Sequence, residues 1–259
     1  MSDVFTFHEG DTPLMISIPH DGWQIPSAVV QYMTGEGRGI PDTDWHVSQL
    51  YEFARDRGAS MLVANFSRYV IDLNRPADDS AMYAGQLSTG LCPTRTFAGD
   101  EIYAEELEIA TDLRIERFWR PYHDKLAVTL ARLKERHGYA LLWDAHSIRS
   151  EVPALFDGEL PVLNLGTWDG QSCDPAIADA VMATATASPY AAVMNARFKG
   201  GYITRHYGQP KEQVHAMQLE LAQRAYMNEK TLEFEEDRAA GLRDTLDRLL
   251  GSFQGAAAQ

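Results

Sequence analysis

Residues 140–147 read ALLWDAHS, and together with LMISIPHDG at residues 14–22 they decide the fold. Each stretch begins with four or five residues that are nearly continuous in apolar character and leads into a segment that contains a histidine. Short, continuous apolar runs are typical of strands that are buried on both faces of a sheet. Similar runs occur at Met61–Ala64, Tyr69–Leu73 and Val162–Leu165. The sequence therefore predicts a sheet of buried strands with a histidine at the end of two of them.

Helical patterns separate these runs. We expect a helix over Thr43–Arg57, and a long helical pattern over about 101–137 that Pro121 divides, because proline lacks the amide hydrogen and clashes with the preceding turn. Asp174 is a suitable N-cap for another helix, with Pro175 at its first position. A final amphipathic helix is indicated by Leu242, Leu246, Leu249 and Leu250.

Strands that alternate with helices indicate the α/β class, with a central sheet covered by helices. No internal repeat and no long linker divides the sequence, so we expect a single domain over residues 1–259. The last residues, 252–259, are small and polar and are predicted to fray.

Acidic residues predominate: 37 Asp and Glu against 23 Lys and Arg give a formal charge of −14. Nucleic acids and anionic membranes are therefore excluded as main partners, because both require a basic surface. The first residues lack the basic and apolar regions of a signal peptide, and no apolar run is long enough to span a bilayer. We expect a cytoplasmic protein with Cys92 and Cys173 reduced, as a monomer or a homo-oligomer.

The two histidines indicate a metal site. Ligands of open α/β sheets bind beyond the carboxyl ends of the strands, where His20 and His146 are expected. Two imidazoles and one carboxylate are a suitable ligand set for a catalytic zinc ion, with a fourth position left for water. The carboxylate comes from Asp44 or from Asp42, in the segment PDTDW at residues 41–45; helix capping is the alternative role of either.

A second polar segment, DLNRP at residues 72–76, follows another predicted strand. The planar guanidinium of Arg75 suits a carboxylate ligand, and a surface ion pair is the alternative. Arg68 lies nearby in the sequence and adds a second positive charge. The glycine-bounded segment GGYITRHYG at residues 200–208 is interpreted as a binding loop, with a hairpin as the alternative.

Glu220 lies in the segment AMQLEL, residues 216–221. Its alternation favours a strand that places Gln218 and Glu220 on one side, although a helical pattern also fits and would leave Glu220 exposed. On a mainly buried strand the carboxyl group is desolvated, which raises its pKa toward the range of a general base.

Eight motifs together resemble the N-formylglutamate amidohydrolase family, from about Leu14 to Asn228. The motifs are SIPHDG (17–22), DTDWHV (42–47), DLNRP (72–76), LCPTRTFAGDEIY (91–103), DAHS (144–147), NLGT (164–167), GGYITRHYG (200–208) and QLELAQRAYM (218–227). The family is distantly similar to the zinc carboxypeptidases and aspartoacylases. The resemblance implies a mixed, mostly parallel sheet flanked by helices, the phosphorylase/hydrolase-like fold of zinc carboxypeptidases.

The resemblance also implies a site with one Zn²⁺ per chain. It assigns the last zinc histidine to His146 and the catalytic glutamate to Glu220. In the relatives a glutamate ligand stands three residues after the first histidine, but here that position is Trp23. The acidic ligand must therefore come from elsewhere, and Asp44 is our choice, with Asp42 in reserve.

For the substrate, the resemblance implicates Asn74 and Arg75, to which we add Arg205 and Arg68, as ligands of the two carboxylates. The implied reaction is the hydrolysis of N-formyl-L-glutamate, a small anion, to formate and L-glutamate in histidine degradation. Two alternatives stay open: an amidohydrolase for another N-acylated acidic amino acid, as in the aspartoacylases, and a non-catalytic protein that binds a small acid on the same fold.

Overall fold

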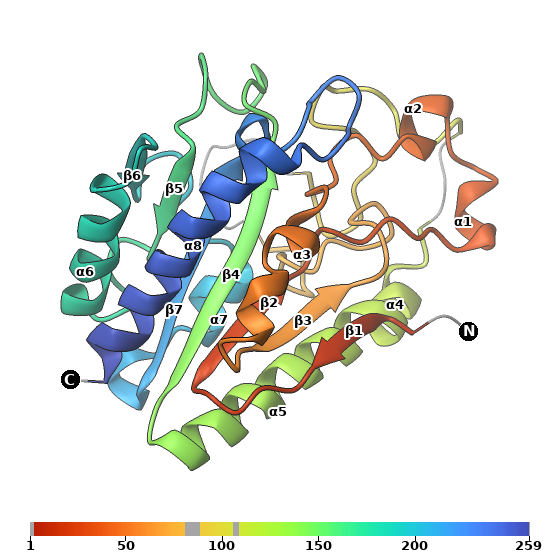
Figure 1. Cartoon of the computed structure of the whole chain (residues 1–259). Coiled ribbons are helices and arrows are strands. Elements are labelled where there is room, and N and C mark those ends of the chain that lie inside the picture. The colour runs from red at the N-terminus through yellow and green to blue at the C-terminus, as the bar shows by residue number, and fades with distance from the viewer. Residues whose placement is uncertain (1–2, 81–88, 106–108, 259) are drawn as a thin grey trace.

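The computed structural model describes residues 3–80, 89–105 and 109–258, which form one mixed seven-stranded sheet with helices on both sides (Figure 1). The spatial order of the strands is β1-β3-β2-β4-β7-β5-β6. The pairs β1–β3 and β5–β7 are antiparallel, and the other four pairs are parallel. The strands are β1 (Phe5–His8), β2 (Leu14–Ile18), β3 (Ser60–Ala64), β4 (Ala140–Ile148), β5 (Leu163–Gly166), β6 (Ala192–Met194) and β7 (Val214–Ala222). The predicted α/β class and mostly parallel sheet are confirmed.

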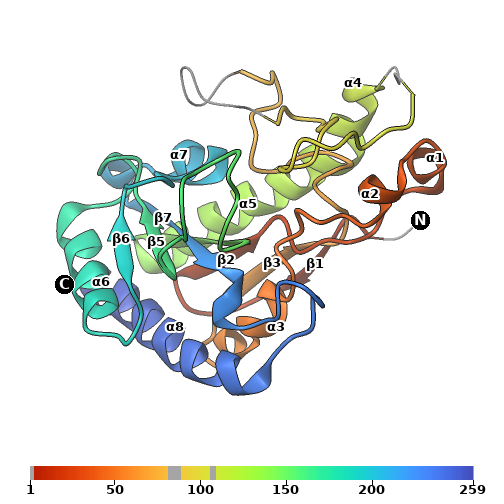
Figure 2. The ribbon, with the colours of Figure 1, turned by 90° about the horizontal axis from the view of Figure 1, so that it is seen from above.

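Helices cover both faces of the sheet, as the view from above shows (Figure 2). The α-helices are α1 (Ser27–Val30), α2 (Gly35–Arg38), α3 (Val47–Leu50), α4 (Thr111–Arg114), α5 (Arg120–His137), α6 (Pro175–Thr186), α7 (Tyr202–Tyr207) and α8 (Glu236–Ala257). Short turns are η1 (Glu52–Arg55), η2 (Ile115–Trp119), η3 (Pro210–Glu212) and η4 (Gln223–Ala225). Helices α3, α6 and α8 pack on one face, and α5 and α7 pack on the other.

Side chains alternate between these two faces. In β4, Trp143 and Ala145 belong to the core beneath α8, whereas Leu142 belongs to the core beneath α5. Asp144 and His146 point to the same side as Leu142, because they lie two and four residues further along the strand. The functional groups of β4 therefore face the layer that contains α7.

The predicted strand Tyr69–Leu73 is wrong, although its residues are buried. Its backbone groups have partners outside any sheet: Nη1 of Arg114 donates to the Val70 carbonyl at 2.7 Å. The amide of Asp72 donates to the Leu91 carbonyl, also at 2.7 Å. The apolar run therefore predicted burial correctly, but the hydrogen-bond partners of the backbone determined its conformation.

The predicted helix over Thr43–Arg57 is much shorter in the structure. His46 has a left-handed backbone, with φ of 64°, so α3 begins only at Val47. After α3 the chain continues as the 3₁₀ turn η1. Residues 43–46 are consequently free to turn and to bring Asp44 toward β2.

Proline does not divide the long helix. A continuous helix runs from Thr111 to His137 through α4, the π-helical turn η2 and α5, so the predicted start near 101 and the break at Pro121 are both wrong. In the π turn, the amide of Arg120 donates to the Ile115 carbonyl, five residues earlier. Pro121 then lies in the first turn of α5, where a missing amide hydrogen is tolerated. Part of the predicted segment, 106–108, lies outside the described residues.

The predicted fraying of 252–259 is wrong for residues 252–257, and residue 259 lies outside the described residues. Helix α8 extends to Ala257, and Phe253 is fully buried against Trp143, with ring centroids 5.6 Å apart. Phe253 continues the stripe of Leu246, Leu249 and Leu250 by one further turn, so it enters the same core.

Two other predictions concern the second half of the chain. The strand interpretation of residues 216–221 is confirmed, since they lie inside β7. The segment 200–208 is not a loop, because Tyr202–Tyr207 form the short helix α7. No helix in the described ranges combines the length and apolar character that crossing a bilayer requires.

Candidate metal centre and substrate cavity

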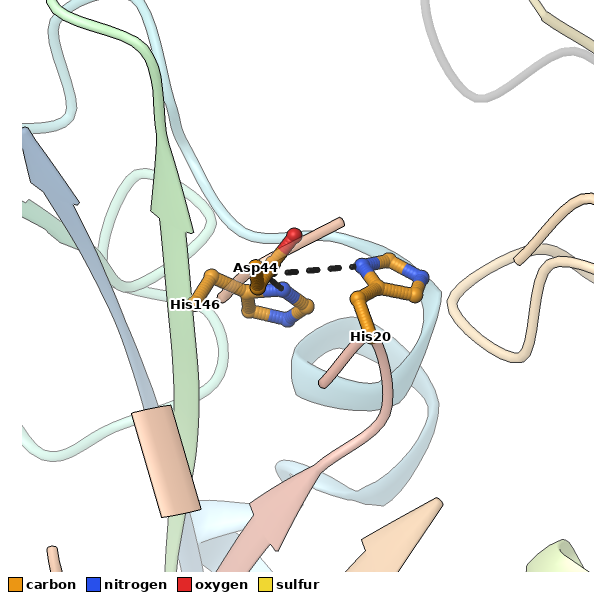
Figure 3. A group of neighbouring side chains, drawn as sticks. All are labelled: His20, Asp44 and His146. Carbon is orange, nitrogen blue, oxygen red and sulfur yellow. Dashed lines mark hydrogen bonds and ion pairs between the residues drawn. The ribbon is translucent and has the colours of Figure 1, made fainter. Parts of the chain in front are cut away.

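Three side chains from separate segments meet at the carboxyl ends of the parallel strands (Figure 3). His20 follows β2, Asp44 precedes α3, and His146 lies in β4. One ligand atom of each lies within 4.8 Å of the others, and all three residues are buried. Two imidazoles and a carboxylate fit the ligand preference of zinc, with room for a fourth ligand.

Each imidazole is oriented by a second carboxylate. Nε2 of His20 lies 2.7 Å from Oδ1 of Asp72, and Nε2 of His146 lies 3.2 Å from Oδ2 of Asp144. This leaves both Nδ1 atoms facing Oδ2 of Asp44, at 3.8 Å for His20 and 3.1 Å for His146. Carboxylates behind metal-binding histidines fix the tautomer and the ring orientation. The role of Asp72 was missed by the sequence analysis, although the DLNRP motif contains this residue.

The charges around the cluster favour a cation. Burial lowers the pKa of His146, but the carboxylates of Asp144 and Asp44 outweigh burial and raise the pKa well above its ordinary value. Burial raises the pKa of Asp44, but His146, His20 and Arg68 outweigh it and lower that pKa. The buried carboxylates therefore stabilise positive charge at the position that a metal ion would take.

Asp44 and Asp42 have different partners. The amide of Asp44 donates to the His20 carbonyl at 3.0 Å, which places its carboxylate in the cluster. Asp42 instead accepts hydrogen bonds from the Tyr69 hydroxyl at 2.5 Å and from the Phe97 amide at 2.8 Å. Of the two candidates, only Asp44 belongs to the cluster that could hold a metal ion.

Glu220 in β7 is paired in register with His146 in β4. It is 7% exposed, and Nε2 of Gln218 donates to its Oε2 at 3.0 Å. Burial raises the pKa of Glu220 to about 8, and Asp44 and Asp144 act in the same direction, while His146 opposes them. A carboxyl group with such a pKa is suited to exchange protons near neutral pH.

A cavity of about 130 Å³ adjoins the cluster and contains Glu220 in its wall. Three arginines also line it: Arg68, Arg75 and Arg197. Arg68 donates to Asp72 at 2.7 Å and lies 3.7 Å from Asp44, so it is paired with the carboxylates of the metal centre. In the part of the chain that the structure describes, the guanidinium of Arg75 has no hydrogen bond or ion pair.

Arg205, predicted as a substrate ligand, is absent from the cavity lining in the described part of the structure. Its Nε donates to the Gly200 carbonyl at 2.8 Å, and its guanidinium lies 5.8 Å from the ring centre of Trp168. Arg197 occupies the cavity wall and was missed by the sequence analysis. The only available signal was its position three residues before the Gly200–Gly201 pair.

Asn74 lies in the cavity wall, but its amide already has partners within the protein. Nδ2 lies 2.9 Å from Nε2 of His146, and Oδ1 accepts from the Ile203 amide at 2.8 Å. Gly201 permits this arrangement, because a Cβ there would lie 2.3 Å from Nδ2 of Asn74. The side chain therefore joins the metal centre to α7.

Comparison with known proteins shows which family the chain belongs to. A family model described as N-formylglutamate amidohydrolase matches residues 12–227. N-formylglutamate deformylase from Pseudomonas putida is 51% identical, over 96% of this chain and 95% of its own. N-formylglutamate deformylase from Pseudomonas aeruginosa is 50% identical, over 98% of this chain and 97% of its own.

Solved structures give the same result for the fold. A crystal structure of N-formylglutamate amidohydrolase from Ralstonia eutropha JMP134 has a TM-score of 0.81 at 28% identity and covers 97% of this chain and 96% of its own. A protein from Agrobacterium tumefaciens has the same fold at 17% identity, with a TM-score of 0.72 over 98% of this chain and 97% of its own. The chain belongs to the N-formylglutamate amidohydrolase family.

Proposed function

We propose that the chain hydrolyses N-formyl-L-glutamate to formate and L-glutamate, in histidine degradation, with one zinc ion held by His20, Asp44 and His146. One observation carries the proposal: a ligand set suited to zinc, a buried carboxyl group and arginines line a single small cavity. The names of the two Pseudomonas relatives support the same reaction. When bound, zinc would supply Lewis acidity, which polarises a carbonyl oxygen and lowers the pKa of water.

Glu220 is the proposed general base. Gln218 holds Oε2, so the other carboxylate oxygen is left to accept a proton from the attacking water. As the C–O bond forms and the C–N bond breaks, Glu220 returns that proton to the departing nitrogen. The products are then formate and glutamate, which leaves as an amine because its nitrogen has received the proton.

Arg75 and Arg197 are the proposed ligands of the two substrate carboxylates, because both line the cavity and Arg68 is paired with the metal centre. A guanidinium holds a carboxylate through two parallel hydrogen bonds, which also fix its orientation. The substrate's formyl amide is thereby held against the reacting groups.

The test is formate release by the purified, zinc-loaded protein, followed by proton NMR. We expect release from N-formyl-L-glutamate, loss of turnover with a chelator, and recovery on addition of zinc. The acetyl analogue N-acetyl-L-glutamate should react at least about tenfold more slowly, because the cavity is small. Failure to release formate, or faster release of acetate from N-acetyl-L-aspartate, would overturn the proposal.

The arginine assignment has its own test. Arg75→Met and Arg197→Met should each raise KM for N-formyl-L-glutamate by about tenfold or more, since each loses a charged hydrogen-bond partner. Arg248→Met, on the exposed side of α8, is the matched control. An unchanged KM in either cavity variant would remove that arginine from the site.

A further inference from the structure

The segment that carries Arg75 is held in place by groups from the helices beside it. Nε2 of His123, in α5, lies 2.9 Å from the Leu73 carbonyl oxygen. Nε1 of Trp119, at the end of η2, donates to the Arg75 carbonyl at 2.9 Å. A carbonyl oxygen only accepts, so Nε2 of His123 carries the ring hydrogen.

The carbonyl between these two is also held. The amide of Tyr202, the first residue of α7, donates to the Asn74 carbonyl at 3.3 Å. Three consecutive carbonyls, those of residues 73–75, thus accept hydrogen bonds from three different helical segments. None of these three donors belongs to a strand, so the carbonyls of this segment are held by the helical layer, while the Asn74 side chain contacts His146 in β4.

The three donor residues and Tyr207 form one packed group, which we call the aromatic clamp: Trp119, His123, Tyr202 and Tyr207. The rings of Trp119 and His123 are stacked, with centroids 3.8 Å apart and planes inclined by 24°. The hydroxyl of Tyr207 lies 3.0 Å from Nδ1 of His123, the nitrogen left to accept. Tyr202 packs against both Trp119 and His123, with centroids 5.9 and 5.5 Å away.

The π turn explains why the clamp can form. Trp119 and His123 are four residues apart, so both lie on one face of the helix, toward the segment 73–75. The π turn ends at Trp119, the first residue of this pair, and such turns are frequent at functional sites. The helix thereby brings two ring N–H groups to one short stretch of backbone.

We propose that the aromatic clamp positions Arg75 for the substrate carboxylate, so that Trp119 and His123 determine substrate affinity without contacting the substrate. This inference rests on the proposed role of Arg75 in the preceding subsection. In the described ranges the Arg75 guanidinium has no hydrogen bond or ion pair, and its charge acts on Asp72 from a greater distance. Its place in the cavity therefore depends on its backbone, which the clamp holds at the carbonyls of Arg75 and of the two residues before it.

The first test is Trp119→Phe, which keeps a ring to stack on His123 and removes the indole N–H. We expect KM for N-formyl-L-glutamate to rise about threefold to tenfold, the effect of one lost hydrogen bond, with kcat changed less than about threefold. Trp143→Phe is the matched control, because it removes another buried indole hydrogen bond, to the Tyr51 hydroxyl at 2.9 Å. The control should lose stability and keep its KM.

The second test separates this inference from the proposed reaction. Binding of glutarate, a dicarboxylate, to the zinc-loaded protein is measured by calorimetry, which needs no turnover. Trp119→Phe should weaken glutarate binding about threefold to tenfold in the wild-type background and have no further effect in the Arg75→Met background.

Three results overturn the clamp: equal effects of Trp119→Phe in both backgrounds, unchanged KM and glutarate affinity in the single variant, or no glutarate binding by the wild type. Weaker glutarate binding in Trp119→Phe without formate release by the wild type would reject the proposed reaction and retain the clamp.

Discussion

Glu220 and His146 lie side by side on neighbouring parallel strands, yet their surroundings shift their pKa values for different reasons. For Glu220, burial dominates and raises the pKa of the carboxyl group to about 8. For His146, two carboxylates outweigh burial and favour positive charge. The environment thus gives two neighbouring buried groups different charge preferences, as their proposed roles in proton transfer and metal binding require.

Replacing Glu220 by Gln should lower kcat by about 10²- to 10⁴-fold, because the amide cannot take a proton from water. Zinc content should stay at one per chain, since Glu220 is not one of the three clustered ligands. Steady-state kinetics and metal analysis measure the two quantities. Glu212→Gln, an exposed glutamate near Lys134, is the control. Undiminished turnover in Glu220→Gln would reject its role as the base.

His123 makes stability depend on pH. Burial lowers its pKa to about 3, and His206 acts in the same direction, against the hydrogen bond to Leu73. In the unfolded chain the pKa is about 6.5, so between these values the unfolded state binds one more proton. The contribution of neutral His123 to the free energy of unfolding is therefore complete above pH 6.5. It is lost as the pH falls below this value, by about 1.4 kcal/mol per pH unit.

The variant His123→Gln lacks this titration. The stability difference between wild type and variant should therefore shrink by about 1.4 kcal/mol per pH unit between pH 6 and pH 4.5. Urea unfolding at several pH values measures it. Parallel pH profiles of the two proteins would show that His123 is not held neutral in the folded state.

At the scale of elements, the helices that depart from their sequence patterns are those that shape the site. Left-handed His46 delays α3 and lets Asp44 reach His20. The π turn in the 111–137 helix brings Trp119 to the Arg75 carbonyl. Local propensity favours a regular helix in both places, but helix propensity is a small free-energy term, so tertiary contacts outweigh it.

Helix α8 gives a direct test of an element boundary. Phe253→Ala should lower the free energy of unfolding by about 3–5 kcal/mol, because it leaves a cavity beside Trp143 in the main core. Urea unfolding measures the loss, and Gln254→Ala, the partly exposed neighbour on the same turn, should change stability much less. Equal effects of the two substitutions would show that the last turn is not packed on the core.

On the scale of the whole molecule, the net charge of −14 contrasts with a cavity that has as many arginines as carboxylates in its wall. The lining contains Arg68, Arg75 and Arg197 together with Asp44, Asp72 and Glu220, whereas acidic residues outnumber basic ones in the chain as a whole. Local charge decides which ligand binds, and the net charge keeps polyanions away. The fold brings the site residues together because the carboxyl ends of β2, β4 and β7 lie at one edge of the sheet.

Zinc should stabilise the entire fold, because His20, Asp44 and His146 come from segments that meet only in the native state. At a free zinc concentration of about 100 times Kd, the gain is about 2.7 kcal/mol, or about 5–10 °C in Tm. Differential scanning calorimetry with and without zinc measures the shift. The shift should disappear in Asp44→Asn and persist in Asp42→Asn; the reverse result would make Asp42 the ligand.

The sequence by itself determined the α/β class, the strands at 14–18, 140–143 and 216–221, and the place of His20 and His146 at strand ends. These follow from hydrophobic periodicity and from the polar residues next to each apolar run, which are local properties. It also singled out Glu220 and Arg75, which stand next to or within such runs and which both line the cavity.

Only the tertiary structure decided which of two neighbouring groups enters the site. Asp44 rather than Asp42 joins the histidines, and Arg197 rather than Arg205 lines the cavity. The same holds for the segment 69–73, which is buried without being a strand. These outcomes depend on partners distant in the sequence, such as the Tyr69 hydroxyl that binds Asp42, and local pattern carries no information about such partners.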